Sequence, residues 1–421
     1  MISKFGRLLI VLPLVFSACR TGSDSSSGTE EDLVEKARAI HERVITIDTH
    51  DDIPFNFATP EVDPGVRGDR QVDIEKMEEG GLDVAFFVVY VGQTERTPEN
   101  YERAKADALT KFEAIHRMAE EMYPDKIEIP YTADDVERIL SEGKKVAAIG
   151  IENGFVIGKD LSLLQRYQEL GARYMTLAHG GHNDIADSAT PRENLDESEE
   201  EHGGLSEFGE EVVAEMNRVG ILVDVSHISK NAMLDAVRVS KAPVIASHSS
   251  ARALCDVPRN MDDEQLLALA ENGGVIQMVA LDRFVKKWPQ EKQDAVDQVR
   301  QDLGITSRAA FRTMTDEQRQ EYQDRLKEIT EIWPRTNVSE YVDHIDYAVN
   351  LMGIEHVGIS SDFDGGGGID GWNDASETFN ITVELVRRGY TEEEIEMIWS
   401  GNTLRIWREM ERVSSELKGE V

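Results

Sequence analysis

Cysteine is scarce in this 421-residue chain, which has two cysteines, Cys19 and Cys255. If Cys19 carries a lipid, as the N-terminal segment described below indicates, no disulfide can form within the chain, and a buried core must supply the stability. The sequence after that segment also lacks a long apolar run, which excludes a later transmembrane helix. Material for a core is ample, because 40% of the residues are hydrophobic and 30% are charged, as in soluble globular proteins.

Basic residues are few relative to acidic ones, 45 against 81, and the formal net charge is −36 at pH 7. A surface this acidic repels nucleic acid and anionic membranes, so neither is expected as a direct binding partner. The same charge attracts cations, and a metal ion therefore stays open as a ligand of a carboxylate-rich cleft.

The first residues form a separate segment. Lys4 and Arg7 precede an apolar run over residues 8–16, which two small residues and Cys19 follow. A basic start, a short apolar stretch and small residues at a cleavage site are typical of a secretory signal peptide, and a cysteine at this place resembles a bacterial lipobox. We therefore expect residues 1–18 to be a lipoprotein signal peptide and Cys19 to be lipidated. The protein would be exported to the bacterial cell envelope, with the lipid as its membrane anchor; an ordinary signal peptide cleaved nearby is the alternative.

Short β-rich runs recur along the rest of the chain, with amphipathic helical segments between most of them. This alternation predicts parallel strands joined by right-handed crossovers, and eight such units fit a (β/α)₈ TIM barrel, an α/β fold. An open doubly wound sheet would show a Gly-rich phosphate loop after its first strand, and none is present there. The predicted strands are 44–48, 84–91, 146–151, 174–178, 221–225, 244–247, 275–280 and 357–360.

One segment, residues 281–337, breaks this rhythm. It is charged, helical in pattern and much longer than a usual barrel loop, so we predict a helical insertion after strand seven, where it can cover the mouth of the barrel. The polar stretch that follows Cys19 predicts a flexible tether over residues 19–32. The barrel domain is then expected to span residues 33–421.

Titratable residues follow most of the predicted strands. In barrel enzymes the chemistry gathers at the C-terminal ends of the strands, which the fold brings together. A single histidine after a strand is more often a packing or capping residue than a ligand, but this combination indicates a metal site. The residues are His50 and Asp52 after strand one, Glu152 after strand three, His179 after four, His227 after five, His248 after six and Asp362 after eight.

The ligand types indicate which metal this site would bind. Imidazole and carboxylate without thiolate suit Zn²⁺, with Mn²⁺, Co²⁺ and Fe²⁺ as rivals. Five candidate ligands are too many for one catalytic zinc and suit two metals that share a bridging carboxylate, for which Glu152 is the natural choice. His50 and Asp52, two residues apart, can address one metal, and His227 and His248, from adjacent strands, the other.

These residues lie in motifs that together resemble the membrane dipeptidase (renal dipeptidase) family of metal-dependent, amidohydrolase-like barrels. The resemblance runs from about Leu33 to about Arg408 and also includes residues 183–188 and 338–353. The motifs are DTHDDIP at 48–54, GIENG at 150–154, RYMTLAH at 173–179, DVSHIS at 224–229, SHSSAR at 247–252, RNM at 259–261 and HVGISSDFDG at 356–365.

The resemblance implies a zinc-dependent metallopeptidase with two zinc ions per subunit. Such an enzyme hydrolyses the peptide bond of small-molecule dipeptides through a hydroxide that bridges the two metals. Members of the family are commonly dimers, so a homodimer is one expectation. The implied roles are one zinc on His50, Asp52 and Glu152, the other on Glu152, His227 and His248, substrate contact by His179, binding of the substrate carboxylate by Arg259, and proton transfer by Asp362.

Two residues depart from the family pattern. Asp51 and Asn153 stand where many members have Asn and Gly, beside metal ligands whose set is intact. We expect Asp48 to orient a ligand from behind and Asp51 to point away from His50 and Asp52. The family pattern leaves the substrate side chains, and the choice between L- and D-residues, open.

Two other functions compete with the dipeptidase. A related amidohydrolase acting on N-acyl-amino acids or other small amides would share the same metal site. A lipoprotein that binds peptides or metal without turnover would be expected to lack a ligand or the counterpart of Asp362, and neither is missing.

Overall fold

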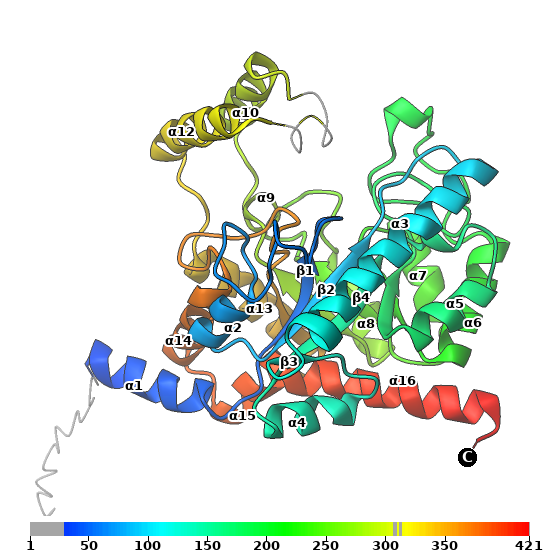
Figure 1. Ribbon diagram of the computed structural model, residues 1–421, viewed down its shortest axis with the longest axis horizontal. Helices are drawn as coiled ribbons and strands as arrows, with labels where there is room; N and C mark the ends of the chain where they lie inside the picture. The colour runs from blue at the N-terminus through cyan, green and yellow to red at the C-terminus, as the bar shows by residue number, and fades with distance from the viewer. Residues whose placement is uncertain (1–28, 306–309, 311–313, 421) are drawn as a thin grey trace, which may run out of the picture.

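The computed structural model describes residues 29–305, 310 and 314–420 (Figure 1). The expected signal peptide and Cys19 lie outside the described residues. Helix α1 (Glu30–His41) begins with Thr29 as its N-cap, whose hydroxyl accepts a hydrogen bond from the amide of Asp32. Residues 30–32, which were expected to belong to the tether, are therefore helical.

Eight parallel strands form a nearly closed barrel, which confirms the predicted (β/α)₈ fold. They follow one another around the barrel in chain order, and one further strand of two residues, β3 (Ile127–Glu128), pairs with β4 alone. The barrel closes where the amide of Asp52 donates to the carbonyl of Phe363, with 2.9 Å between nitrogen and oxygen. The strands are β1 (Ile47–Asp52), β2 (Val84–Tyr90), β4 (Lys145–Glu152), β5 (Ala172–Thr176), β6 (Leu222–Asp224), β7 (Ile245–Ser249), β8 (Val275–Val279) and β9 (Val357–Ser360).

The first strand differs from its prediction. It spans Ile47–Asp52 instead of 44–48, with an irregular register between Asp48 and Asp51. The polar residues therefore do not follow the strand but form its second half, and all six residues are buried. They can be buried because they are hydrogen-bonded; Asp48, for example, accepts from the amide of Ser361 at 2.9 Å.

Helices cover the outside of the barrel and close its N-terminal end. Helix α16 (Asn402–Lys418) runs beneath the barrel (Figure 1) and packs Leu404, Ile406 and Trp407 against the lower residues of the strands, such as Val84. A site can therefore open only at the opposite end. The other long helices are α3 (Pro98–His116), α4 (Ala133–Ser141), α5 (Ser162–Glu169), α6 (Glu207–Val219), α7 (Lys230–Val239), α8 (Asp263–Glu271), α13 (Val338–Met352) and α14 (Phe379–Arg388); α2 (Ile74–Gly80) and α15 (Glu392–Glu396) are shorter. Within the described ranges, no helix combines the length and apolarity needed to cross a membrane.

The helical insertion after the seventh barrel strand, β8, is confirmed. It contains α9 (Asp282–Val285) and then α10 (Gln290–Asp302) and α12 (Asp316–Ile332), which we call the arm. The two arm helices pack on each other through a small core of their own that includes Val299 and Tyr322. In Figure 1 the arm lies beyond the C-terminal ends of the strands, above α9, on the side where a site can open.

Candidate active site

The candidate metal ligands, His179, Arg259 and Asp362 all lie at the C-terminal end of the barrel. The strands supply some of them directly, and short loops supply the others. His50 and Asp52 lie in β1, Glu152 ends β4 and His248 lies in β7, whereas His179, His227, Arg259 and Asp362 follow β5, β6, β7 and β9.

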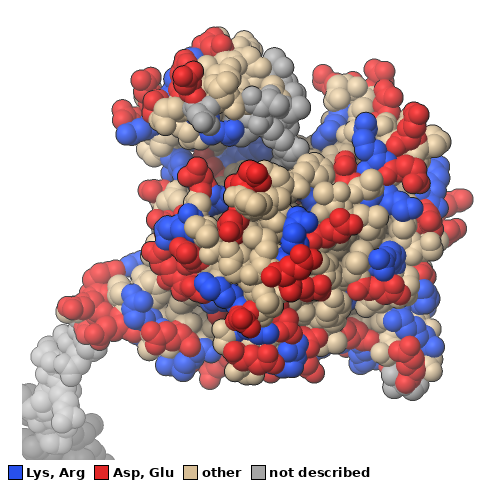
Figure 2. Space-filling view, in the orientation of Figure 1, with Lys and Arg blue, Asp and Glu red and all other residues tan. Residues whose placement is uncertain are grey.

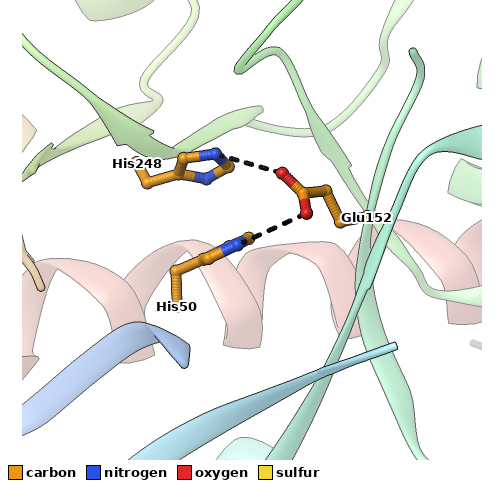
Figure 3. A group of neighbouring side chains, drawn as sticks. All are labelled: His50, Glu152 and His248. Atoms are coloured by element: carbon orange, nitrogen blue, oxygen red, sulfur yellow. Dashed lines mark ion pairs between the residues drawn. The ribbon is translucent and has the colours of Figure 1, made fainter. Parts of the chain in front are cut away.

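Glu152 occupies the centre of this group, and its side chain is buried. Its Oε1 lies 3.0 Å from Nε2 of His227, 3.4 Å from Nε2 of His248 and 3.5 Å from Nε2 of His179. Its Oε2 lies 3.8 Å from Nε2 of His50. Figure 3 shows the two carboxylate oxygens directed at different imidazoles, His248 and His50. One oxygen of this carboxylate thus faces His227, His248 and His179, and the other faces His50.

A second cluster lies on the His50 side of Glu152. One ligand atom each from His50, Asp52 and Asp362 lies within 4.8 Å of the others. Gly365 makes room for it, because a Cβ at this position would lie 2.2 Å from Oδ1 of Asp362 and 2.7 Å from Oδ2 of Asp52. The glycine is therefore required by the close approach of the two carboxylates.

The tautomer of His50 follows from its contact with Tyr174. The Tyr174 hydroxyl donates its single hydrogen to the carbonyl of Thr49 at 2.9 Å, so it must accept from Nδ1–H of His50 at 3.0 Å. Burial raises the pKa of this hydroxyl, which keeps it protonated. In the neutral form of His50, Nε2 therefore carries a lone pair that points to Glu152, and it has no hydrogen-bond partner within the described chain.

His248 is oriented in the same way by a relay through Ser247. The Ser247 hydroxyl donates to Oδ2 of Asp224 at 2.7 Å and therefore accepts from Nδ1–H of His248 at 2.8 Å. Asp224 is held in turn by the amides of Ser226 and Ser247, at 3.0 and 2.9 Å from its Oδ1. Nε2 of His248 thus also presents a lone pair to Glu152.

Lone pairs that are directed at a carboxylate repel its negative charge, and a cation bound between them would remove this repulsion. Burial lowers the pKa of His248 and of His227 well below the usual range, so neither supplies that charge. Burial alone would also lower the pKa of His50, but the carboxylates of Glu152, Asp362 and Asp52 raise it to about 9. Despite burial, which opposes this effect, the surrounding histidines hold the pKa of Glu152 well below its usual range. The carboxylates thus favour positive charge at His50, beside the neutral imidazoles of His227 and His248. A divalent metal such as zinc would supply that charge in place of the proton on His50.

Three residues beside these ligand atoms have strained backbones. Asn153, His227 and Asp362 have φ angles of 84°, 67° and 57°, a region that residues other than glycine rarely occupy. Asn153 is held there by its side chain, which donates to the carbonyl of Val91 at 3.1 Å. Such strain concentrates at functional sites, where it fixes the direction of side chains.

Arg259 lies behind His248. Its guanidinium donates from Nη2 to the carbonyl of His248 at 2.9 Å and lies over the ring of Phe284, whose centroid is 5.3 Å from Cζ. Burial lowers the pKa of Arg259 to about 10, so it stays charged at neutral pH. Its Nε is buried without a hydrogen-bond partner among the residues the structure describes.

The sequence did not predict the roles of Tyr174, Ser247 and Asp224. The role of Asp224 could have been predicted, because an acidic residue at the end of an apolar strand is unusual. Tyr174, in contrast, looks like an ordinary strand residue. Asp48, which was expected to orient a ligand from behind, accepts at Oδ1 from the backbone amide of His50 at 3.3 Å. This contact does not reach the imidazole, so the orienting role stays a prediction. Asp51, which was expected to point away from His50 and Asp52, accepts a hydrogen bond from the hydroxyl of Ser361 at 3.3 Å.

Comparisons with known proteins show which family the chain is similar to. A family model described as "Membrane dipeptidase (Peptidase family M19)" matches residues 34–421. Dipeptidase tcpJ of Claviceps purpurea is 32% identical over 353 residues, which make up 83% of this chain and 71% of that protein. Dipeptidase aclJ of Aspergillus oryzae is 33% identical over 354 residues, 82% of this chain and 72% of that protein. The crystal structure of the probable dipeptidase PvdM from Pseudomonas aeruginosa is similar with a TM-score of 0.80 and 32% identity, covering 91% of this chain and 99% of that one.

The contact between Tyr174 and His50 predicts the effect of Tyr174→Phe. Without the hydroxyl, His50 loses the group that fixes its tautomer, and we expect zinc affinity to fall about 10- to 100-fold. The measurement is a titration against a competing zinc chelator. Tyr167→Phe is the matched control, because Tyr167 is also buried and donates to a backbone carbonyl, that of Val156 at 2.9 Å, away from the ligands. Equal zinc affinity in the two variants would contradict the role of Tyr174.

Proposed function

The chain belongs to the membrane dipeptidase family and is a metallo-dipeptidase, and we propose that it works with two zinc ions bridged by Glu152. The observation that carries this proposal is the direction of the two Glu152 oxygens, one toward His227 and His248 and the other toward His50. His50, Asp52 and Glu152 would hold one zinc, and Glu152, His227 and His248 the other. Bound zinc would polarise the substrate carbonyl and lower the pKa of water, so that a nucleophile exists at neutral pH.

The remaining polar residues have roles that suit their positions. Asp362 is buried next to His50 and Asp52, where its carboxylate can accept a proton from the attacking water and return it to the leaving amine. His179 faces Glu152 and packs its ring on Tyr90, with 4.8 Å between centroids, so its imidazole can donate to the carbonyl oxygen as negative charge develops there.

Arg259 would bind the free carboxylate of the substrate. A guanidinium offers a planar fork of donors that matches a carboxylate, and the buried Nε lacks a partner among the described residues. This charge is held by its hydrogen bond to the carbonyl of His248, beside a proposed metal ligand. A substrate carboxylate bound there would favour dipeptides over longer chains.

A dipeptide panel tests this function. Zinc-loaded protein is assayed with dipeptides that carry L- or D-residues at each position, alongside N-acyl-amino acids. We expect dipeptides to be hydrolysed with a higher kcat/KM than the acylated amino acids. Turnover of N-acyl-amino acids with no hydrolysis of any dipeptide would instead support the related amidohydrolase.

Asp362→Asn tests proton transfer. The amide keeps the size of the side chain but cannot accept the proton, so we expect kcat to fall about 10²- to 10⁴-fold, the usual contribution of general acid–base catalysis. Zinc content, measured by elemental analysis, is expected to stay at the wild-type level. If zinc content falls as far as activity, Asp362 acts as a metal ligand and its proposed role is wrong.

We also propose that the mature chain is tethered to a membrane by lipid on Cys19. Support comes from the leader sequence, which lies outside the described residues. In a bacterial host, the full-length chain is expected in the membrane fraction, and Cys19→Ser is expected to move it to the soluble fraction of the envelope. Mass spectrometry of the N-terminal peptide gives an independent measurement. An unmodified N-terminus cleaved at another residue would show that the leader is an ordinary signal peptide.

A further inference from the structure

The loop that carries Asp362 has a strained backbone. It follows β9 with the sequence DFDGGGG at residues 362–368, and we call it the Asp362 loop. Asp362 and Asp364 have φ angles of 57° and 60°, and the carbonyl of Asp362 accepts from the amides of Gly365 and Gly367 at 3.1 and 2.8 Å. Residues with a side chain rarely adopt such φ angles, and glycines lose more conformational entropy on folding than other residues. Contacts from outside the loop must therefore hold it in this conformation.

Gln71, which lies between β1 and α2 in the chain, makes such contacts. Its Oε1 accepts from the amide of Asp364 at 2.7 Å, and its Nε2 donates to the carbonyls of Gly367 and Asn373 at 3.1 and 2.7 Å. In return, the amide of Gln71 donates to both carboxylate oxygens of Asp364, each at 3.2 Å. Each of the two side chains thus binds the backbone of the other residue, across 293 positions of the chain.

Arg70 joins this pair to the first strand of the barrel. Its Nη2 lies 2.9 Å from Oδ2 of Asp364 and also donates to the carbonyl of Asp52. Its guanidinium lies over the ring of Phe57, with Cζ 5.9 Å from the centroid. The pair is therefore anchored to the end of β1, so the position of the Asp362 loop is set relative to His50 and Asp52.

The helical insertion holds the far end of the same loop. The amide of Gly368 donates to the carbonyl of Ala280 at 2.9 Å, and the amide of Asp370 donates to the carbonyl of Thr336 at 2.8 Å. Arg335 donates from Nη2 to the carbonyl of Gly368. In Figure 1 and Figure 2 the two arm helices project above the body of the molecule, and it is the ends of the insertion that make these contacts. The insertion thus secures the segment after the glycines, and Gln71 secures the residues between that segment and Asp362.

We propose that Gln71 is a positioning residue for Asp362, because it holds the Asp362 loop so that the carboxylate stays beside His50 and Asp52. This inference rests on the proposed function, since it takes Asp362 to transfer the proton. Proton transfer requires the carboxylate to be within hydrogen-bond reach, and a displacement of about 1 Å can lower a rate on the order of 10²-fold. The partners of Gln71 in the loop, Asp364 and Gly367, are not candidate metal ligands, so zinc binding is expected to be independent of it.

The test is the effect of Gln71→Met in two backgrounds. Methionine keeps the length of the side chain and removes its hydrogen bonds to the loop. With zinc-loaded protein and the dipeptide that is hydrolysed best, we expect kcat to fall about 10- to 100-fold while KM stays within about twofold. In the Asp362→Asn background, the same change is expected to lower kcat by less than about twofold further, because the group that Gln71 positions can no longer accept the proton.

Gln265→Met is the matched control. Gln265 also bonds to backbone through its side chain, since its Oε1 accepts from the amide of Asp262 at 3.1 Å, but it lies on the outer helix α8. Its kcat is expected to stay at the wild-type level. If Gln71→Met does not fold, Asp364→Asn is compared in the same two backgrounds, because it keeps the shape of the other side chain of the pair and removes its charge.

Zinc content and the folded fraction are measured for every variant. An unchanged kcat in folded Gln71→Met would overturn the inference. An equal loss of kcat in both backgrounds would also overturn it, because a general loss of structure would act in this way. If Asp362→Asn alone leaves kcat unchanged, or if N-acyl-amino acids are cleaved and no dipeptide is, the proposed function fails instead.

Discussion

The buried carboxylate of Glu152 is the constraint on which the rest of the site depends. A buried charge is strongly unfavourable unless other groups compensate it, and here histidines from four different strands or their loops surround it. The strands that carry these histidines must therefore end at the same level along the barrel axis. The parallel register that places Glu152 opposite Tyr90 on β2 is part of the same requirement, because it sets that height for neighbouring strands.

A second layer of residues orients the histidines that surround Glu152. Tyr174 and the Asp224–Ser247 pair leave the Nε2 lone pairs of His50 and His248 directed inward. Gly150 belongs to this layer, because a Cβ there would lie 2.1 Å from the Tyr174 ring and displace it. The absence of a side chain at Gly150 on β4 is thus needed to orient a ligand on β1, two strands away in the barrel.

The sequence predicted the barrel, the insertion and every residue now found around Glu152, because these depend on local patterns and on a fold that gathers strand ends. It did not predict where β1 ends, since hydrogen bonds from residues such as Ser361 allow buried aspartates to continue a strand. It also missed Tyr174, whose partner His50 is 124 residues away in the chain. Contacts of this kind depend on register and side-chain direction, which the periodicity of one strand does not contain.

An insertion at one end of the barrel can change the substrate preference without displacing the candidate metal ligands, because other elements hold those ligands in place. The strands fix the ligands, and α16 fills the opposite end with apolar side chains, so the framework of the site is set by the core. The insertion enters only after β8, where α9 reaches Arg259 through Phe284. Because Arg259 donates to the backbone carbonyl of His248 and not to a ligand atom, changes on α9 would act first on this proposed substrate-binding residue. Substrate preference can therefore vary in this loop while the geometry around Glu152 stays constant.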